Sequence, residues 1–450
     1  MAGVLPGKPL VPELDFSSQP YGNLSKRFDI DAAEARSVIE EKLPVLAQLN
    51  ALVSVAFGTN PPLFVDARAP GSPAKLLDTP PEDGAEPDSQ VTIQPASIIQ
   101  FAQGHLEPRF GLFKDAYLYD TAMRKETIPL AIKFADLLTP QGPPAEAKLP
   151  VPGVLEQLPV PTEDIAQVKR DIKQFGYGFV KNALTPTQVA VLRKAVEEQA
   201  AGERKAGIAR MDSGPDAGSG PNQRLWVLTN KGDEFLDLLN HPLIDEIVPW
   251  LIGDHALLHA YAANIARPGN IPMQMHTDQV AIQPPIRDLV FGVNIMFCLT
   301  DMHASNGATR VIPGSHLGHV APADIFSTEG TIAAEAPAGT AFIFESRIWH
   351  GTGANTLTPG SPDSERPAIL MFFMRSFIRS QENYPLSLRP DVAPKLSKRQ
   401  RKFLGFCATG AVGGQDGDIR EGVYFDRRED CPGAIRAPHE PYMPKYTNGV

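Results

Sequence analysis

The sequence predicts a two-domain protein in which an α+β domain precedes an all-β domain with flanking helices. Three observations support this prediction. The chain of 450 residues is long for one domain. Proline recurs through residues 140–162, which favours an extended linker of limited flexibility. After residue 255, short apolar runs alternate with Gly and Pro, a pattern typical of a sandwich or barrel.

Composition narrows the class of protein. The hydrophobic content of 42% and charged content of 21% are those of an ordinary globular protein. The 42 basic and 52 acidic residues give a net charge of −10, which argues against nucleic acid as a partner. No apolar stretch reaches membrane-spanning length, so we expect no integral membrane contact.

The ends of the chain and the cysteines predict a cytoplasmic location. No basic flank precedes an apolar run at the N-terminus, and the C-terminal residues YTNGV are not a peroxisomal signal. Cys298, Cys407 and Cys431 are too widely spaced for a disulfide framework or a thiolate metal cage. A reducing compartment is therefore expected.

Apolar periodicity predicts the elements of the N-terminal domain. They are, in order, a helix over 32–50, strands over 52–58 and 61–68, a loop over 69–88, a strand over 90–95, a helix over 96–104, a strand over 116–120 and a helix over 126–138. This part contains no cluster of His, Asp, Glu or Cys that could perform chemistry.

The C-terminal domain is predicted to open with a helical run over 163–199, in which Thr185 and Pro186 fit an N-cap and the first helical position. Short strands follow. Their predicted ranges are 256–266, 288–300, 309–314, 339–346 and 368–378.

The strongest candidates for metal ligands are His276 and Asp278, which point the same way on extended backbone. The same spacing also suits a simple hydrogen-bonded pair. His350 follows the apolar strand GTAFIFES in a Trp-His-Gly turn, where a barrel strand would deliver a ligand. Two imidazoles and one carboxylate on one face of iron(II) leave three positions for a bidentate 2-oxo acid and dioxygen.

A 2-oxoglutarate cosubstrate needs a cation for its far carboxylate, and a guanidinium suits that geometry. Arg366 begins the strand after His350 and is the leading candidate, with Thr352 as an additional donor. Asn294 is a further candidate for contact with the oxo acid. Because a long loop precedes Arg366, Arg375 and Arg379 are its alternatives.

The sequence does not decide the roles of other residues near these motifs. His316 and His319 follow a Pro-Gly turn, so we expect them to line the substrate entrance rather than bind metal. Arg224 and Trp226 fit either a pocket wall or a structural cation–π stack. Cys298 lies in an apolar strand and is predicted to be a core residue.

Residues 26–139 resemble the sterol carrier protein type 2 domain. The resemblance is carried by 90–138, where the VTI strand, a short helix and a G-x-L-x-P turn precede a strand and the closing helix. A second glycine typical of that family is absent after Lys114. The resemblance implies an apolar tunnel for an acyl chain or sterol. The alternative is a scaffold domain that mediates dimerisation, with a homodimer as the assembly.

Residues 163–407 resemble the phytanoyl-CoA dioxygenase family, and 408–450 form a C-terminal extension. The matching pieces are FGYGFVKNALTPTQVAVLR, HTDQ, FCLTDMHASNGATRVIPGSHLGH and WHGTGAN followed by RPAILMFF. The resemblance implies a double-stranded β-helix of the jelly-roll or cupin type. It implies His276, Asp278 and His350 as iron ligands, and Arg366 and Thr352 as the 2-oxoglutarate site.

The predicted function is therefore an iron(II)- and 2-oxoglutarate-dependent dioxygenase that uses dioxygen, with ascorbate as a candidate additional reductant. Its predicted substrate is lipophilic, such as an acyl-CoA, isoprenoid or sterol, because of the N-terminal resemblance. Halogenating relatives lack the carboxylate, so the intact Asp278 favours hydroxylation. Two alternatives stay open: a polar secondary metabolite as substrate with a purely structural N-terminal domain, and a lipid carrier with an inactive oxygenase domain.

Overall fold

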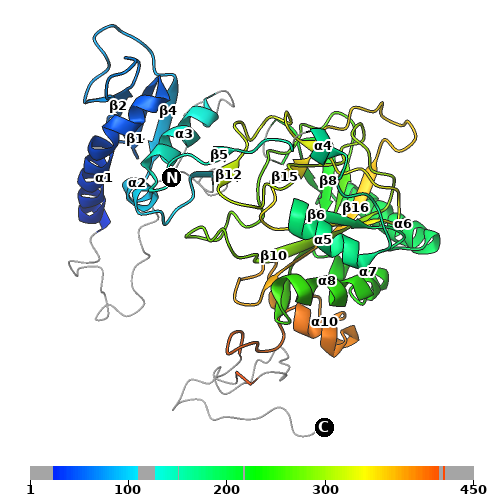
Figure 1. Cartoon of the computed structure of the whole chain (residues 1–450). Coiled ribbons are helices and arrows are strands. Elements are labelled where there is room, and N and C mark those ends of the chain that lie inside the picture. The colour runs from blue at the N-terminus through cyan, green and yellow to red at the C-terminus, as the bar shows by residue number, and fades with distance from the viewer. Residues whose placement is uncertain (1–23, 110–126, 151, 216–217, 415–418, 421–450) are drawn as a thin grey trace, which may run out of the picture. The chain divides into compact units, whose positions relative to one another are not determined.

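The computed structural model divides into two compact units (Figure 1). The first comprises Met1–Ala145 and Val280–Ile286, and the second comprises Glu146–Gln279 and Arg287–Val450. The residues that the structure describes are 24–109, 127–150, 152–215, 218–414 and 419–420. The strand predicted over 116–120 and Cys431 lie outside them.

The first unit contains a four-stranded sheet of order β3-β2-β1-β4 covered by helices. The strands are β1 (Leu52–Phe57), β2 (Leu63–Asp66), β3 (Lys75–Leu77) and β4 (Ser89–Ile93). The helices are α1 (Leu24–Leu46), α2 (Pro95–Ala102) and α3 (Ile128–Leu138), with a 3-10 turn over Ala47–Leu49. Ile39, Phe101 and Phe134 join one buried core with the inward face of the strands.

Most elements predicted for this unit are present within a few residues of the expected bounds. The exception is β3, which lies inside the predicted loop over 69–88. Its three residues are exposed or half-buried at the edge of the sheet, so they lack the alternation that marks a strand. The sterol-carrier-like character of this unit stays a prediction.

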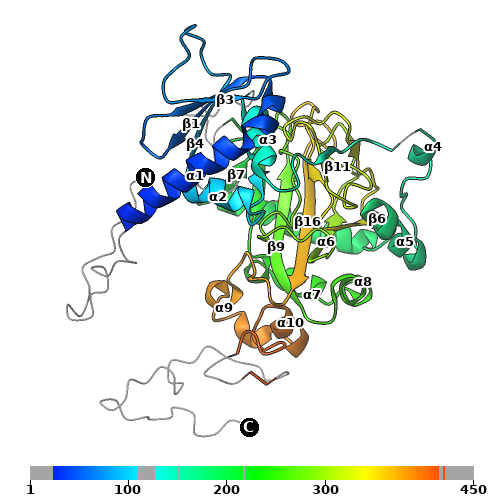
Figure 2. The ribbon, with the colours of Figure 1, turned by 60° about the vertical axis from the view of Figure 1, so that its left-hand side comes forward.

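The second unit is built on a seven-stranded antiparallel sheet of order β6-β14-β10-β16-β9-β8-β7. The strands are β6 (Tyr177–Val180), β7 (Arg210–Asp212), β8 (Asn222–Leu225), β9 (Ala256–Ala266), β10 (Gly292–Cys298), β14 (Ala341–Glu345) and β16 (Arg366–Arg375). Figure 2 shows the two longest of these strands, β9 and β16, side by side.

A smaller antiparallel sheet of order β13-β11-β15 accompanies it. Its strands are β11 (Thr309–Val311), β13 (Ile332–Ala333) and β15 (His350–Thr352). Two antiparallel sheets and peripheral helices make a jelly-roll-like domain, which agrees with the predicted all-β class for this part of the chain.

Alternation along β10 divides the large sheet into two faces. Val293, Ile295 and Phe297 pack into the main core, which includes side chains of the covering helices. Asn294 and Met296 point the other way and line a pocket. The helices are α5 (Ile165–Phe175), α6 (Pro186–Lys205), α7 (Asp233–Leu238) and α8 (Pro242–Ile252) (Figure 1). The sheet face away from these helices is therefore available for a site.

The helical run predicted over 163–199 is two helices separated by a strand. Helix α5 ends at Gly176, whose φ of 86° lies in the left-handed region. Tyr177–Val180 then pair with β14 as strand β6. Helix α6 begins as predicted: Thr185 Oγ1 accepts from the Gln188 amide, and the Gln188 side chain accepts from the Thr185 amide.

Smaller features complete the fold. The proline-rich segment 140–162 contains two short elements, β5 (Ala145–Glu146) and α4 (Pro152–Leu155). Cys298 is fully buried, as predicted, and its Sγ lies 3.2 Å from Met302 Sδ. Within the described ranges, none of the helices combines the length and apolarity needed to cross a membrane.

Candidate metal centre

His276 and His350 are paired through their backbones. Each amide donates to the other residue's carbonyl over 2.9 Å, which forms an isolated antiparallel bridge between the His276 segment and β15. Gly351 allows this close approach, because a Cβ there would lie 2.8 Å from the Met273 carbonyl oxygen. A larger residue in place of the glycine of the Trp-His-Gly turn would therefore collide with this carbonyl.

Both imidazoles turn the same ring nitrogen, Nε2, toward Asp278. His276 Nδ1 lies 3.0 Å from the Gln274 carbonyl, and His350 Nδ1 lies 3.1 Å from the Ile348 carbonyl. A carbonyl only accepts, so in a neutral ring Nδ1 carries the proton and Nε2 is the nitrogen that can bind a metal. Carbonyl partners of this kind orient histidines that bind metals.

Asp278 completes the group from the same segment as His276. Its Oδ1 lies 3.6 Å from His276 Nε2, and its Oδ2 lies 3.6 Å from His350 Nε2. One ligand atom from each of the three residues lies within 4.8 Å of the other two. The next residue, Gln279, fixes the segment: its amide donates to Ser346 O over 3.1 Å.

The negative charge of Asp278 favours binding of a cation by these three residues. Burial raises the pKa of Asp278, but His350, His276 and the Asn294 amide outweigh it and lower the pKa to about 2. Burial lowers the pKa of His350 to about 4 against the attraction of Asp278. At neutral pH Asp278 is therefore a carboxylate and His350 a neutral imidazole, and together with the His276 imidazole they fit a divalent metal of intermediate softness such as iron(II).

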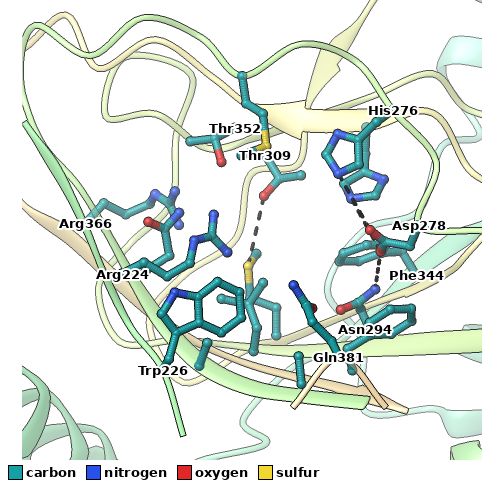
Figure 3. Close-up of a pocket in the computed structure, with 18 residues that line it drawn as sticks. Arg224, Trp226, His276, Asp278, Asn294, Thr309, Phe344, Thr352, Arg366 and Gln381 are labelled. Carbon is teal, nitrogen blue, oxygen red and sulfur yellow. Dashed lines mark hydrogen bonds and ion pairs between the residues drawn. The ribbon is translucent and has the colours of Figure 1, made fainter. Parts of the chain in front are cut away.

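These ligands lie at one end of a pocket that encloses about 730 Å³, including its open mouth (Figure 3). Figure 3 shows Arg366, Arg224 and Thr352 at the opposite end from His276 and Asp278. The remaining lining residues combine apolar and polar side chains: Trp226, Ala260, Ala262, Asn264, Met273, Asn294, Met296, Thr309, Phe344, His350, Leu370, Phe372 and Gln381.

Arg366 is a buried cation without a counter-charge among the described residues. Its side chain is 1% exposed, and neither Nε nor Nη1 has a hydrogen-bond partner there. Burial lowers its pKa to about 10, so it stays charged at neutral pH. An unpaired buried charge is costly, and a carboxylate is the ligand that a guanidinium best accommodates. One end of the pocket therefore carries three potential metal ligands, and the other end carries a guanidinium without a counter-charge among the described residues.

Arg224 and Trp226 fulfil both roles that the sequence left open. They line the pocket, and the Arg224 guanidinium lies 5.5 Å from the centroid of the Trp226 ring. Arg224 Nε also lies 3.4 Å from Asp212 Oδ2, a long contact that leaves the guanidinium able to bind another acceptor. The pocket thus holds a second guanidinium besides Arg366.

Asn294 lines the pocket and also contacts a proposed metal ligand. Its Nδ2 donates to Asp278 Oδ2 over 2.6 Å, and its contact with the oxo acid stays a prediction. The sequence placed Asn294 on the pocket face but contained no signal for this hydrogen bond, because Asp278 lies on a separate segment.

Three other candidates lie away from the metal ligands. His316 Nε2 lies 3.0 Å from the Lys173 carbonyl, and neither His316 nor His319 lines the pocket. The predicted entrance role of these two histidines therefore finds no support in the lining. Arg375 donates from Nε to the Val290 carbonyl over 2.9 Å, and neither it nor Arg379 lines the pocket, whereas Arg366 does.

Sequence reasoning missed three polar lining residues, Asn264 on β9, Thr309 and Gln381. Thr309 comes from the smaller sheet, and Gln381 comes from the irregular segment after β16. The Glu382 amide donates to the His259 carbonyl over 3.2 Å, which fixes that segment beside β9. No local motif marks Gln381, since only this tertiary contact brings it to the pocket.

Comparison with known proteins agrees with this site. Residues 172–360 match the family model described as phytanoyl-CoA dioxygenase (PhyH). Dioxygenase af480 of Aspergillus fumigatus is 29% identical over 42% of this chain and 61% of its own length. Dioxygenase aneA of Aspergillus aculeatus is 32% identical over 39% of this chain and 61% of its own length. The chain thus spans less than two thirds of both relatives.

Among solved structures, the non-heme alpha ketoglutarate dependent carbocyclase SnoK is similar, with 23% identity and a TM-score of 0.39 over 48% of this chain and 86% of SnoK. The three candidate ligands are of the types that bind non-haem iron, and the named relatives are dioxygenases. Residues 172–360 are similar to the phytanoyl-CoA dioxygenase family.

Proposed function

We propose that this chain oxidises a C–H bond of a small organic molecule, with iron(II) held by His276, Asp278 and His350. One observation carries the proposal. Two imidazole nitrogens and a carboxylate converge at one end of a pocket whose other end holds the buried Arg366, whose Nε and Nη1 lack hydrogen-bond partners among the described residues. A metal and a dicarboxylic oxo acid satisfy both ends at once.

Iron bound there with 2-oxoglutarate and dioxygen would supply the oxidising power, and 2-oxoglutarate would leave as succinate and carbon dioxide. The chain's own residues position the reactants. Arg366 would bind the far carboxylate of 2-oxoglutarate, and Thr352, at the same end of the pocket, would donate its hydroxyl. The Gln274 and Ile348 carbonyls would keep both imidazoles in the metal-binding tautomer.

The pocket supports an amphipathic substrate. Trp226, Leu370 and Phe372 provide apolar surface, which agrees with the lipophilic substrate implied by the N-terminal resemblance. Arg224 and Gln381 add groups that bind a polar or anionic substituent. These two residues favour a second candidate, a more polar metabolite that needs no lipid-binding domain.

Catalysis is tested by incubating the full chain with iron(II), 2-oxoglutarate and dioxygen and measuring succinate. We expect slow succinate release without substrate, and faster release with a substrate that fits. Absence of succinate together with absence of bound iron would refute the proposal and favour a lipid carrier with an inactive oxygenase domain.

The substrate class is tested with Arg224→Leu and Trp226→Leu. A polar substrate predicts that Arg224→Leu raises the substrate KM by about 10- to 100-fold, because a charged hydrogen bond contributes about 1.5–3 kcal/mol. A lipophilic substrate predicts the larger effect from Trp226→Leu. Native mass spectrometry of the purified full chain would show whether an apolar ligand co-purifies. Such a ligand would support delivery of the substrate by the N-terminal unit, which raises its local concentration.

A further inference from the structure

We infer that Asn294 is a positioning residue that keeps Asp278 bound to the metal through a single oxygen. The inference rests on the proposed function, because it requires a metal between His276, Asp278 and His350. In this inference Asn294 acts on the metal through the Asp278 carboxylate.

The hydrogen bond has a fixed direction. Asn294 Nδ2 and Asp278 Oδ2 are 2.6 Å apart, and an ionised carboxylate can only accept, so the amide NH2 must face it. Oδ2 is therefore engaged by the amide, whereas Oδ1 accepts no hydrogen bond from Asn294 and is the better metal ligand.

The surroundings of Asn294 hold the amide in place. The side chain is 3% exposed on β10, directly opposite Phe344 on β14 and Phe372 on β16. Both aromatic residues line the same pocket face. In such a weakly polar environment a charge-assisted hydrogen bond is strengthened, and the neighbouring strands restrict the amide's rotation.

Single-oxygen binding matters because of the orientation of Asp278. Its two oxygens each lie 3.6 Å from a different imidazole Nε2, so both face the space where the metal would bind. Three coordination positions must stay open, two for the oxo acid and one for dioxygen. A carboxylate bound through both oxygens would occupy one of them. The Asn294 amide favours the arrangement that leaves all three open.

The test compares wild-type protein with Asn294→Leu, which has a similar volume but no donor. Thr300→Val is the control, because it removes another buried polar group just beyond β10 and outside the pocket lining. Affinity for iron(II) is measured first, without oxygen. Affinity of the iron-loaded protein for 2-oxoglutarate is then measured from the charge-transfer absorption of the chelate. Thermal unfolding checks that each variant folds.

For Asn294→Leu we expect iron affinity within about threefold of wild type, and 2-oxoglutarate affinity lower by about 10- to 100-fold. Thr300→Val should change neither. Unchanged 2-oxoglutarate affinity in iron-loaded Asn294→Leu would overturn the inference, whether or not iron affinity falls, because the residue would then be merely structural. Failure of wild-type protein to bind iron would refute the proposed function, and this inference with it.

Discussion

His276 and His350 are separated by 350 − 276 = 74 residues, yet their backbones exchange two hydrogen bonds of 2.9 Å. This bridge brings the two imidazole centroids to 4.4 Å from each other. Backbone pairing therefore holds the two imidazoles of the proposed metal site beside each other. Preorganised ligands of this kind raise metal affinity.

Replacement of His350 should abolish metal binding. In His350→Ala one of three ligands is lost, and we expect the iron(II) affinity to fall by at least about 100-fold, with no detectable succinate release. Isothermal titration without oxygen measures this. His316→Ala is the matched control, because His316 is equally buried but contacts the Lys173 carbonyl instead. Equal loss in both variants would show that burial, and not ligation, explains the effect.

Replacement of Arg366 should raise the stability of the ligand-free protein and weaken its binding of 2-oxoglutarate. In Arg366→Met an unpaired buried charge is replaced by an apolar side chain, so we expect the ligand-free protein to be more stable by about 1–3 kcal/mol. The same variant should bind 2-oxoglutarate at least about 100-fold more weakly, with iron affinity unchanged. Chemical denaturation and 2-oxoglutarate titration measure the two effects. Arg375→Met, outside the pocket, should keep 2-oxoglutarate affinity; if it does not, the assignment of Arg366 is wrong.

His259 should contribute to destabilisation in acid. Burial lowers its pKa from 6.5 to about 4, so between these values the unfolded chain binds a proton that the folded chain does not. Stability must therefore fall as the pH drops from 6.5 towards 4. Over this pH interval, the free energy of unfolding of His259→Phe should fall by about 2–3 kcal/mol less than that of wild type. Urea unfolding at pH 7 and pH 4.5 measures the difference, and identical pH dependence in the two proteins would contradict it.

A buried ion cluster should stabilise the first unit. Arg109 donates to Asp136 over 2.8 and 2.9 Å and to Glu107 over 3.1 Å, and all three side chains are buried. Asp136→Ala would leave the Arg109 charge undercompensated, and we expect a loss of about 3–5 kcal/mol. Denaturant unfolding measures the loss.

The control for the ion cluster is Asp78→Ala, which breaks the exposed Arg36–Asp78 ion pair. We expect this change to cost much less stability than Asp136→Ala, because water and salt screen an exposed ion pair. If the two variants lose similar amounts of stability, burial does not strengthen the Asp136 interaction as argued.

The sequence predicted the parts of the site that depend on local pattern. Alternation placed Asn294 and Met296 on one face of β10, and the two histidine motifs identified the imidazoles. It did not predict that Asn294 binds Asp278, or that Gln381 reaches the pocket, because both depend on contacts between separate segments. The break at Gly176 was missed because β6 is stabilised by pairing with β14, which outweighs the helical pattern around it.

The most direct test of the account is to locate the metal. Crystals grown with manganese(II) and 2-oxoglutarate would show its position by anomalous X-ray scattering. The account predicts a single strong peak coordinated by His276 Nε2, His350 Nε2 and one oxygen of Asp278, with the far carboxylate of 2-oxoglutarate on Arg366. A metal bound elsewhere, or a triad that stays empty at saturating manganese(II), would contradict it.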